Sequence, residues 1–315
     1  MAGSKLVDPY GRSIRKLRLS LTDQCNFRCC YCMPKDAEFM DQGHYLDSLE
    51  YCEIIAELLE LGITEVRLTG GEPLLRKDFA IILKNIAKLP IPKLSLTTNG
   101  SLLHRHFATL KQCNLQHINI SLDTLRSPVL QTISHHQSLA QVISNIKTAV
   151  NLNFVVKLNT VVMAGINDGE LIDLVEFAKQ QGVIIRFLEL MAIGYSRHLY
   201  TQHFIAAETI LNRLRSYYAL SPIETEPDAT AFYFRTNCGA VIGFIASESQ
   251  PFCANCSRWR LTADGRLYAC LFEANGISLK GLTADQRQQV YQQVLGIKPY
   301  RRSPQVNHLM HRIGG

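Results

Sequence analysis

Three cysteines near the start of the chain could bind a metal cluster. Cys25, Cys29 and Cys32 follow a Cys-x3-Cys-x2-Cys pattern directly after residues 15 to 22, whose alternation predicts a strand. Thiolates grouped on one loop are typical ligands of soft metals and iron–sulfur clusters. Because such clusters usually take four thiolates, a loop with three either takes a ligand from elsewhere or leaves one iron open to a small molecule.

A second cysteine group lies near the end of the chain. Two residues separate Cys253 from Cys256, and Cys270 follows fourteen residues later. The segment between them predicts a hairpin that turns at Asp264 and Gly265, which would bring Cys270 back to the other two. A structural zinc site normally needs a fourth ligand. This group alone therefore leaves zinc and an iron–sulfur cluster equally open.

The elements that must position these cysteines alternate between strands and amphipathic helices. Strands are predicted to begin near residues 15, 65, 93, 117, 155 and 183. The segments between them carry apolar residues at spacings of three and four, which favours helices. Six such units predict an α/β protein with a parallel, barrel-like sheet and helices outside.

Polar residues occupy alternate positions of the predicted strands. Arg18 separates Leu17 from Leu19, and Arg67 follows Val66. Because strand side chains alternate between two faces, the apolar face should meet the helices and the polar face should point inward. A packed barrel interior would be filled with Val, Ile and Leu, so the pattern favours a lined cavity. The alternative, an antiparallel sheet with one solvated face, is disfavoured by the helical segment between every pair of strands.

Six cations are directed at this space: Arg18, Arg67, Lys157, Arg186, Arg258 and Arg260. Buried charges are costly unless an anion compensates them, and arginine forks match phosphate oxygens. The cations therefore indicate a polyphosphate ligand. Pairing with inward acids such as Glu72 and Asp123 would account for only part of the set.

The TGGEP segment, residues 69 to 73, follows the second predicted strand. Its glycines let the backbone approach a ligand, and Glu72 can accept a hydrogen bond from an ammonium group. Ligands of barrel folds bind at the carboxyl ends of the strands, which is where this segment lies.

Composition limits the classes of protein that remain. The chain has 315 residues, 47% of them apolar, and a net charge of +6 without a basic run, so nucleic-acid binding has weak support. No segment approaches the ~20 apolar residues of a membrane span, and no apolar signal peptide begins the chain. We therefore expect a cytoplasmic protein with no nucleic-acid and no membrane partner, whose ten cysteines are metal ligands rather than disulfides. The polar linker near residue 225 predicts a division into residues 1–225 and 226–315.

The motifs together resemble a known family. Cys-x3-Cys-x2-Cys followed by GGEP is similar to the radical S-adenosylmethionine superfamily. The fuller set resembles the GTP 3′,8-cyclase family of molybdenum-cofactor biosynthesis: LRLSLTDQCNFRCCYCMP, VRLTGGEPLLR, LTTNG, INISLDTL, VKLNTVVMAGIND, RFLELM, FCANCSRWRLTADG and the final IGG. The resemblance runs from about residue 9 to the end. It implies a partial, open (βα)6 TIM-like barrel with a smaller C-terminal α+β extension that carries a second cluster.

The resemblance also implies cofactors and site residues. Two [4Fe–4S] clusters would be held, one by Cys25, Cys29 and Cys32 and one by Cys253, Cys256 and Cys270. The implied contacts with S-adenosylmethionine are Tyr31, Gly70, Gly71, Glu72, Asn99, Ser121 and Met191. The implied contacts with GTP are Arg18, Arg67, Thr97, Lys157, Arg186, Arg258, Trp259 and Arg260. The implied catalytic residues are Arg18, Gly314 and Gly315.

The implied reaction is a radical cyclisation. A 5′-deoxyadenosyl radical would take hydrogen from ribose C3′ of GTP, and the carbon radical would add to purine C8. The product, (8S)-3′,8-cyclo-7,8-dihydroguanosine 5′-triphosphate, would pass to a downstream pterin-forming enzyme. The resemblance further implies a flavodoxin- or ferredoxin-like electron donor and leaves room for a homodimer. Two residues depart from the family pattern: Glu65 stands where lysine is common, and Ser257 where asparagine is common.

Two alternatives remain. A radical enzyme that modifies a peptide or protein could carry the same cysteine groups, but it would leave the six cations and the terminal glycines unexplained. A non-catalytic zinc or cluster protein would need four ligands per site and would give no role to GGEP or the inward arginines.

Overall fold

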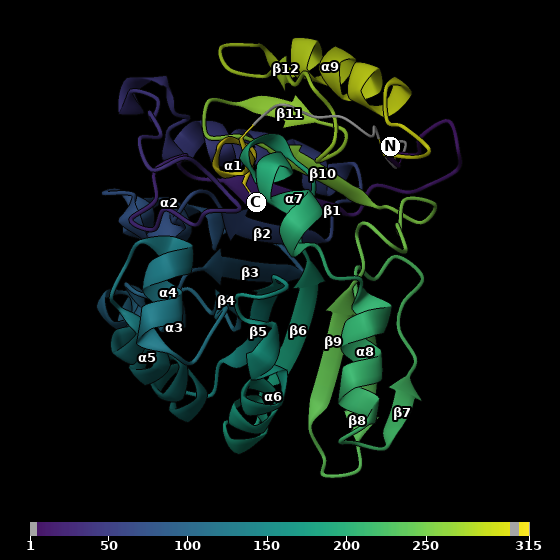
Figure 1. Cartoon of the computed structure of the whole chain (residues 1–315). Helices are drawn as coiled ribbons and strands as arrows, with labels where there is room; N and C mark the ends of the chain where they lie inside the picture. Colours follow the sequence, from purple (N-terminus) through teal and green to yellow (C-terminus); the bar gives the residue numbers. More distant parts are fainter. Residues whose placement is uncertain (1–4, 303–308, 315) are drawn as a thin grey trace.

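The fold is built around one sheet, which has twelve strands within the described part of the chain (Figure 1). A computed structural model of the protein describes residues 5–302 and 309–314. Six strands neighbour one another in chain order and run parallel: β1 (Lys16–Ser20), β2 (Glu65–Thr69), β3 (Lys93–Thr98), β4 (His117–Ser121), β5 (Val155–Val162) and β6 (Ile184–Glu189). They are the six strands that alternation predicts. Within the described residues β1 and β6 do not pair with each other, so the α/β class and the partial, open barrel are confirmed.

Helices connect these strands and cover the outside of the sheet (Figure 1). They are α1 (Ser48–Glu60), α2 (Phe79–Ile86), α3 (Phe107–Gln112), α4 (Ser127–Ser134), α5 (Leu139–Asn151) and α6 (Leu171–Gln180). A capping box headed by Asp47 begins α1, and Tyr51, Ile54, Ile55 and Leu58 form its buried stripe. The core therefore lies between the helices and the apolar face of the strands, which leaves the polar face for the interior.

Strands from the C-terminal part flank both edges of the parallel strands. β9 (Val241–Ile245) runs parallel to β6 and is followed in the sheet by β8 (Phe232–Thr236) and β7 (Leu220–Ile223). β10 (Arg258–Leu261) runs parallel to β1 and is followed by β11 (Arg266–Tyr268) and β12 (Ile277–Ser278). The predicted boundary at residue 225 lies between β7 and β8, which pair with each other, and the sheet continues across it.

Shorter segments and the remaining helices complete the fold. α7 (Arg197–His203) and α8 (Ala207–Arg215) follow β6, and α9 (Ala284–Gly296) follows β12. The 3₁₀ segments are η1 (Gln42–His44), η2 (Pro73–Leu75), η3 (Leu103–Arg105), η4 (Asp168–Glu170), η5 (Gly194–Ser196) and η6 (Met310–Arg312). Among the described residues, no helix combines the length and apolar character that crossing a membrane requires.

Candidate active site

The first cysteine loop lies at the carboxyl end of β1. Cys25, Cys29 and Cys32 line one pocket with Gly71, which follows β2, and Ser121, which ends β4. The pocket forms here because the carboxyl ends of parallel strands meet at one edge of a barrel. Burial raises the pKa of Cys25 to about 12 and raises that of Cys29 well above its usual range. A bound metal reverses this preference by stabilising the thiolates.

The two glycines after β2 let its end approach the cysteine loop. A Cβ on Gly70 would lie 2.6 Å from the carbonyl oxygen of Thr22, and one on Gly71 would lie 2.3 Å from that of Gln24. Both contacts are with backbone, so a larger residue at either position would displace the loop. Gly70 and Gly71 both line the first pocket, as the predicted cofactor contacts require.

Glu72 joins the ends of two strands. Its carboxylate accepts hydrogen bonds from the backbone of Leu74 and Asn99, at 3.1 and 2.7 Å, and from Thr98 Oγ1 at 2.7 Å. Burial raises its pKa to about 7, and its side chain lies outside the pocket lining. Asn99 does line the pocket, with Nδ2 3.9 Å from Cys25 Sγ. Glu72 therefore has a positioning role, and its direct contact with S-adenosylmethionine stays a prediction.

The first pocket opens into a larger central cavity. Tyr31 and Ser121 line both spaces, and Met191 lines the central one. The Tyr31 hydroxyl donates to Asp123 Oδ2 at 2.6 Å, and the Asp123 carboxylate also accepts from the backbone of Val161 at 2.9 Å. The Asp123 carboxylate, which lies where the two spaces meet, therefore accepts hydrogen bonds from neutral donors.

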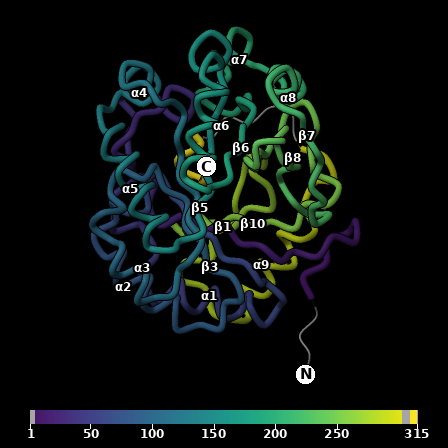
Figure 2. Tube along the Cα trace, turned by 90° about the horizontal axis from the view of Figure 1, so that it is seen from below, coloured from purple at the N-terminus to yellow at the C-terminus, as the bar shows by residue number. Residues whose placement is uncertain are grey.

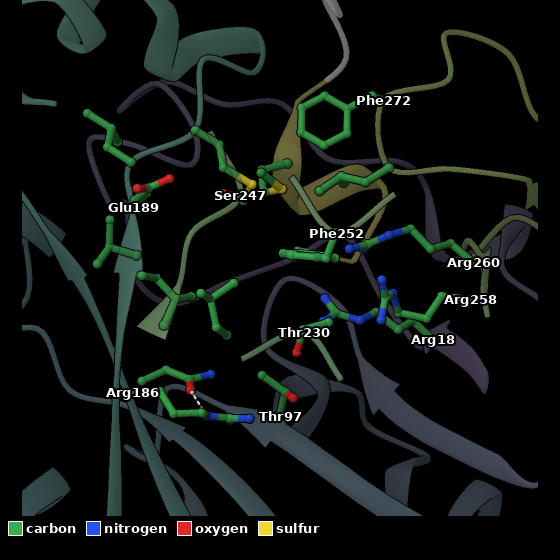
Figure 3. A pocket seen from close by; sticks show the side chains of 18 of the residues that line it. Arg18, Thr97, Arg186, Glu189, Thr230, Ser247, Phe252, Arg258, Arg260 and Phe272 are labelled. Carbon is green, nitrogen blue, oxygen red and sulfur yellow. Dashed lines mark hydrogen bonds between the residues drawn. The ribbon is translucent and has the colours of Figure 1, made fainter. Parts of the chain in front are cut away.

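Arginines from neighbouring strands line the central cavity (Figure 3). Arg260, Arg18 and Arg67 are in register across β10, β1 and β2, so they form a row on one face. Arg186 enters from β6 and lies near Thr97 on another side of the cavity (Figure 3). Burial, together with the cations Arg260 and Arg67, holds the pKa of Arg18 well below its usual range. The row is therefore a strongly positive region inside the barrel.

Most of the predicted cations have no carboxylate partner in the described part of the chain. Within residues 5–302 and 309–314, no carboxylate oxygen lies within 4.0 Å of the charged groups of Arg18, Lys157, Arg186, Arg258 or Arg260. Arg67 differs, because its Nη2 lies 2.6 Å from Glu65. Glu72 and Asp123, the acids considered as partners, bind neutral donors instead. An anionic ligand would compensate the charges of these five cations.

The positive region extends toward the amino ends of the strands. A second chamber there is bounded by Lys16, Lys93 and Lys157, and it shares several arginines with the central cavity. Lys157 Nζ lies 5.5 Å from the ring centroid of Tyr233. Glu65 stands between Lys16 and Lys93 in the strand register, and its carboxylate lies 3.2 Å from Lys93 Nζ. This family departure thus places an acid among the cations, and Glu224, Glu226 and Asp228 also line the chamber.

The second cysteine group faces the same central cavity. Cys253, Cys256 and Cys270 all line it. The predicted hairpin is confirmed: β10 and β11 pair antiparallel, and Gly265 in the turn has φ of +82°. The hairpin therefore returns Cys270 to the other two cysteines, and both cysteine groups face one connected space.

No ready-made site for a metal ion is found in the described part of the chain. Among the described residues, no three His, Cys, Asp or Glu side chains are arranged to hold a single metal ion. All ten cysteines are free thiols. Burial disfavours the Cys256 thiolate, but Arg258 and Lys298 outweigh this effect and lower its pKa to about 7.

The end of the described chain enters the barrel, and Figure 2 shows it near the centre of the molecule. Gly314 has φ of +71°, and a Cβ there would lie 2.5 Å from Thr69 Oγ1 and 3.2 Å from Ser20 Cβ. Arg260 donates hydrogen bonds to two carbonyls of the tail, one of them that of Gly314. Gly315 lies outside the described residues. Gly314 therefore lies beside Arg260, one of the arginines predicted to contact substrate.

Trp259 lies on the opposite face of β10 from the cavity. It is in register with Leu17, is fully buried, and its ring centroid lies 6.3 Å from that of Tyr291 in α9. The alternation that turns Arg258 and Arg260 inward turns Trp259 outward. The prediction that the Trp259 side chain contacts substrate is therefore wrong.

Other cavity residues were not predicted. Thr230 lines both the central cavity and the second chamber, and Met310 lies where the first pocket meets the central cavity. Thr230 belongs to the polar linker, which shows no periodicity, and Met310 belongs to the tail. Lys16 and Lys93 could have been predicted as cavity residues from the sequence, because each begins its strand at a position whose side chain points inward.

Comparisons with known proteins agree with this geometry. Residues 19–178 match the Radical SAM superfamily, and residues 183–307 match Molybdenum Cofactor Synthesis C. The crystal structure of Streptococcus suis SuiB bound to precursor peptide SuiA has a TM-score of 0.66 at 14% identity, covering 91% of this chain and 67% of that chain. SuiB bound to S-adenosylmethionine has a TM-score of 0.64 at 14% identity, covering 90% and 68%. At these identities the likeness shows the fold alone. The fold, the first cysteine loop and the superfamily match define a radical S-adenosylmethionine protein.

Curated relatives narrow this class. The GTP 3′,8-cyclase of Synechocystis sp. is 53% identical over 310 residues, which cover 98% of this chain and 95% of the relative. The cyclase of Aquifex aeolicus is 38% identical, covering 87% of each chain, and that of Marinobacter nauticus is 36% identical, covering 96% of this chain and 94% of the relative. The chain belongs to the GTP 3′,8-cyclase family. A [4Fe–4S] cluster and S-adenosylmethionine are accordingly its cofactors.

Proposed function

We propose that the protein converts GTP to 3′,8-cyclo-GTP inside the barrel, the first step of molybdenum-cofactor biosynthesis. The observation that carries this proposal is the set of five inward cations that line the central cavity and the second chamber without carboxylate partners among the described residues. The second cysteine group lines the same central cavity, and the pocket of the first group adjoins it. A triphosphate supplies the missing anionic charge. Family membership supplies the reaction.

The two chambers suggest how GTP is oriented. The triphosphate would lie among Lys157, Arg186 and Arg258, which line the second chamber and have no carboxylate partner among the described residues. The ribose would then lie by the row that contains Arg18, and the guanine would face the second cysteine group. This orientation places the ribose between the two cysteine groups, which is what transfer of hydrogen at the sugar requires.

The first pocket fits the cofactors of the family. Its three cysteines, the close approach of the glycine turn and the polar strand ends form a cradle for a cluster and a small ligand. When bound there, the cluster and S-adenosylmethionine supply the 5′-deoxyadenosyl radical. The protein's own residues hold the ribose in reach and exclude water: Thr97 and Ser121 line the junction, and the Arg260-bound tail lies against the ends of β1 and β2.

We further propose a second [4Fe–4S] cluster on Cys253, Cys256 and Cys270. The three cysteines line one cavity together with Arg258, which lowers the pKa of Cys256 and so favours the thiolate that a cluster needs. A flavodoxin- or ferredoxin-like electron donor, a downstream pterin-forming enzyme and a homodimer stay predictions from the family.

Ligand binding tests the proposed orientation. Equilibrium dialysis of the reconstituted protein should give GTP at least tenfold tighter binding than guanosine, because only GTP compensates the cations. Arg258→Ala should remove most of this difference. Arg266→Ala is the matched control, because Arg266 lies on the same hairpin, is exposed and pairs with Asp264. Equal affinities for GTP and guanosine would exclude the triphosphate site.

A further inference from the structure

Two buried cations contact the segments that carry the second cysteine group. Arg12 is 7% exposed and Lys298 is 2% exposed. Arg12 lies near the beginning of the chain and Lys298 follows α9 near its end. We call this pair the cationic clamp. The fold brings the two residues together beside a hairpin that neither of them belongs to.

Lys298 makes three contacts, one for each hydrogen of an ammonium group. Its Nζ lies 2.9 Å from the carbonyl oxygen of Arg258, 2.7 Å from that of Ala269 and 3.7 Å from Cys256 Sγ. An ammonium group has three donors and no acceptor, whereas a neutral amine has only two hydrogens to donate. With Cys256 as a thiolate, which can only accept, the three contacts match an ammonium group. Because Ala269 precedes Cys270, one side chain ties together the segments of two cysteines.

Arg12 reaches the third segment. Its Nη1 lies 2.7 Å from the carbonyl oxygen of Cys253, and its Nη2 lies 2.9 Å from that of Pro299, directly after Lys298. Asp8 compensates the charge of Arg12, with Oδ2 2.6 Å from Nε. The clamp thus contacts the segments of all three cysteines and links them to each other.

The charge of Lys298 lacks a carboxylate partner within the described residues. In the ranges 5–302 and 309–314, no carboxylate oxygen lies within 4.0 Å of its Nζ. A buried ammonium group is costly unless an anion lies against it. Besides the two carbonyl oxygens, Nζ contacts Cys256 Sγ, which is anionic as a cluster ligand. Hydrogen bonds to the sulfurs and net local charge are among the features that set the reduction potential of a cluster.

We propose that the cationic clamp assembles the second cluster and favours its reduced state, with Arg12 and Lys298 fixing the three cysteine segments and Lys298 supplying the stabilising charge. This inference rests on the second cluster proposed above. Lys298 lies outside the cavity lining, so it is a positioning residue, and its effect should appear in the cluster itself rather than only in turnover.

The test isolates the second cluster in the full-length protein. Cys25, Cys29 and Cys32 are replaced by alanine, so that any cluster formed on anaerobic reconstitution is the second one. Lys298→Gln then removes the charge, and Lys298→Arg keeps it. Lys280→Gln is the matched control, because Lys280 Nζ also donates to backbone carbonyls, those of His44 and Tyr45 at 2.9 and 3.0 Å, and among the described residues it contacts no sulfur.

Two readouts decide the outcome. The parent and Lys280→Gln should bind the iron of one [4Fe–4S] cluster. Lys298→Gln should either lose at least half of that iron or keep it with a ratio of reduced to oxidised cluster about tenfold lower at a fixed potential, measured by electron paramagnetic resonance. A tenfold ratio in a one-electron couple corresponds to about 59 mV. Lys298→Arg should keep the iron and shift the ratio less.

Different results would overturn the cationic clamp and the second cluster. Lys298→Gln with the iron content and the ratio of Lys280→Gln would overturn the clamp and leave the second cluster standing. A parent that binds no iron would overturn the second cluster itself. If circular dichroism shows that Lys298→Gln does not fold, Lys298→Arg provides the test. Loss of at least half of the iron in that variant, which keeps the charge, would overturn the role of charge.

Discussion

Gly314 gives the strongest test of how the barrel interior is completed. Its φ of +71° lies in the left-handed region, and a Cβ there would approach Thr69 Oγ1 to 2.5 Å. The left-handed conformation costs a residue with a side chain about 1–2 kcal/mol, and the contact with Thr69 adds to that cost. Because 1.4 kcal/mol is about tenfold in an equilibrium constant, Gly314→Ala should lower the equilibrium constant for docking of the tail by at least tenfold.

The assay is product formation by the reconstituted enzyme with saturating GTP and S-adenosylmethionine. If the docked tail completes the site, formation of cyclised nucleotide by Gly314→Ala should fall in proportion to the docked population, by as much as about tenfold. Iron content should not change, because a Cβ on Gly314 would meet Ser20 and Thr69 rather than a cysteine.

Two further variants separate the cost of the left-handed backbone from the cost of the contact with Thr69. Gly281 has φ of +74°, and no atom of the described residues lies within 4 Å of the place that a Cβ would occupy. Gly281→Ala therefore introduces the same backbone strain at a position outside the cavity, and it should leave turnover unchanged. Thr69→Ala removes the contact in the Gly314→Ala background and should restore part of the activity. Full activity of Gly314→Ala, or an equal loss in Gly281→Ala, would refute the reasoning.

Three further predictions concern Glu65, Asp228 and Trp259. Glu65→Gln frees Arg67 and Lys93 and should tighten GTP binding on the order of fivefold at low salt, with a smaller gain at high salt in equilibrium dialysis. Burial opposes ionisation of Asp228, but Ser257, Lys16 and Arg15 outweigh it and lower the pKa to about 2. Asp228→Asn should therefore lower the free energy of unfolding of the iron-free protein at pH 6, and urea denaturation should show the difference narrowing as the pH falls from about 4 toward 2. Trp259→Ala should cost about 3–5 kcal/mol in the same assay, because it empties a core site, while the KM for GTP stays constant.

Strand alternation predicted the barrel and the direction of its side chains. The inward positions of Arg18, Arg67 and Arg186 follow from a period of two, which local sequence reports well. The same rule places Trp259 outward between Arg258 and Arg260, against the substrate contact that the family resemblance implies for this residue.

Long-range pairing could not be predicted in the same way. The parallel pairing of β10 with β1, which brings Arg260 beside Arg18, joins segments far apart in the sequence and is set by the packing of the whole sheet. The six-residue helix α3 and the four-residue strand β7 are also too short to show a period. The occupation of Glu72 by backbone donors depends on how the ends of β2 and β3 meet, which no local pattern reports.

The position of hydrogen transfer tests the central claim most directly. GTP that carries deuterium at ribose C3′ is incubated anaerobically with the reconstituted protein, S-adenosylmethionine and dithionite, and the products are analysed by mass spectrometry. We predict 3′,8-cyclo-GTP together with 5′-deoxyadenosine that has gained the deuterium. Unlabelled 5′-deoxyadenosine that forms equally without GTP, with no cyclised nucleotide, would contradict the account.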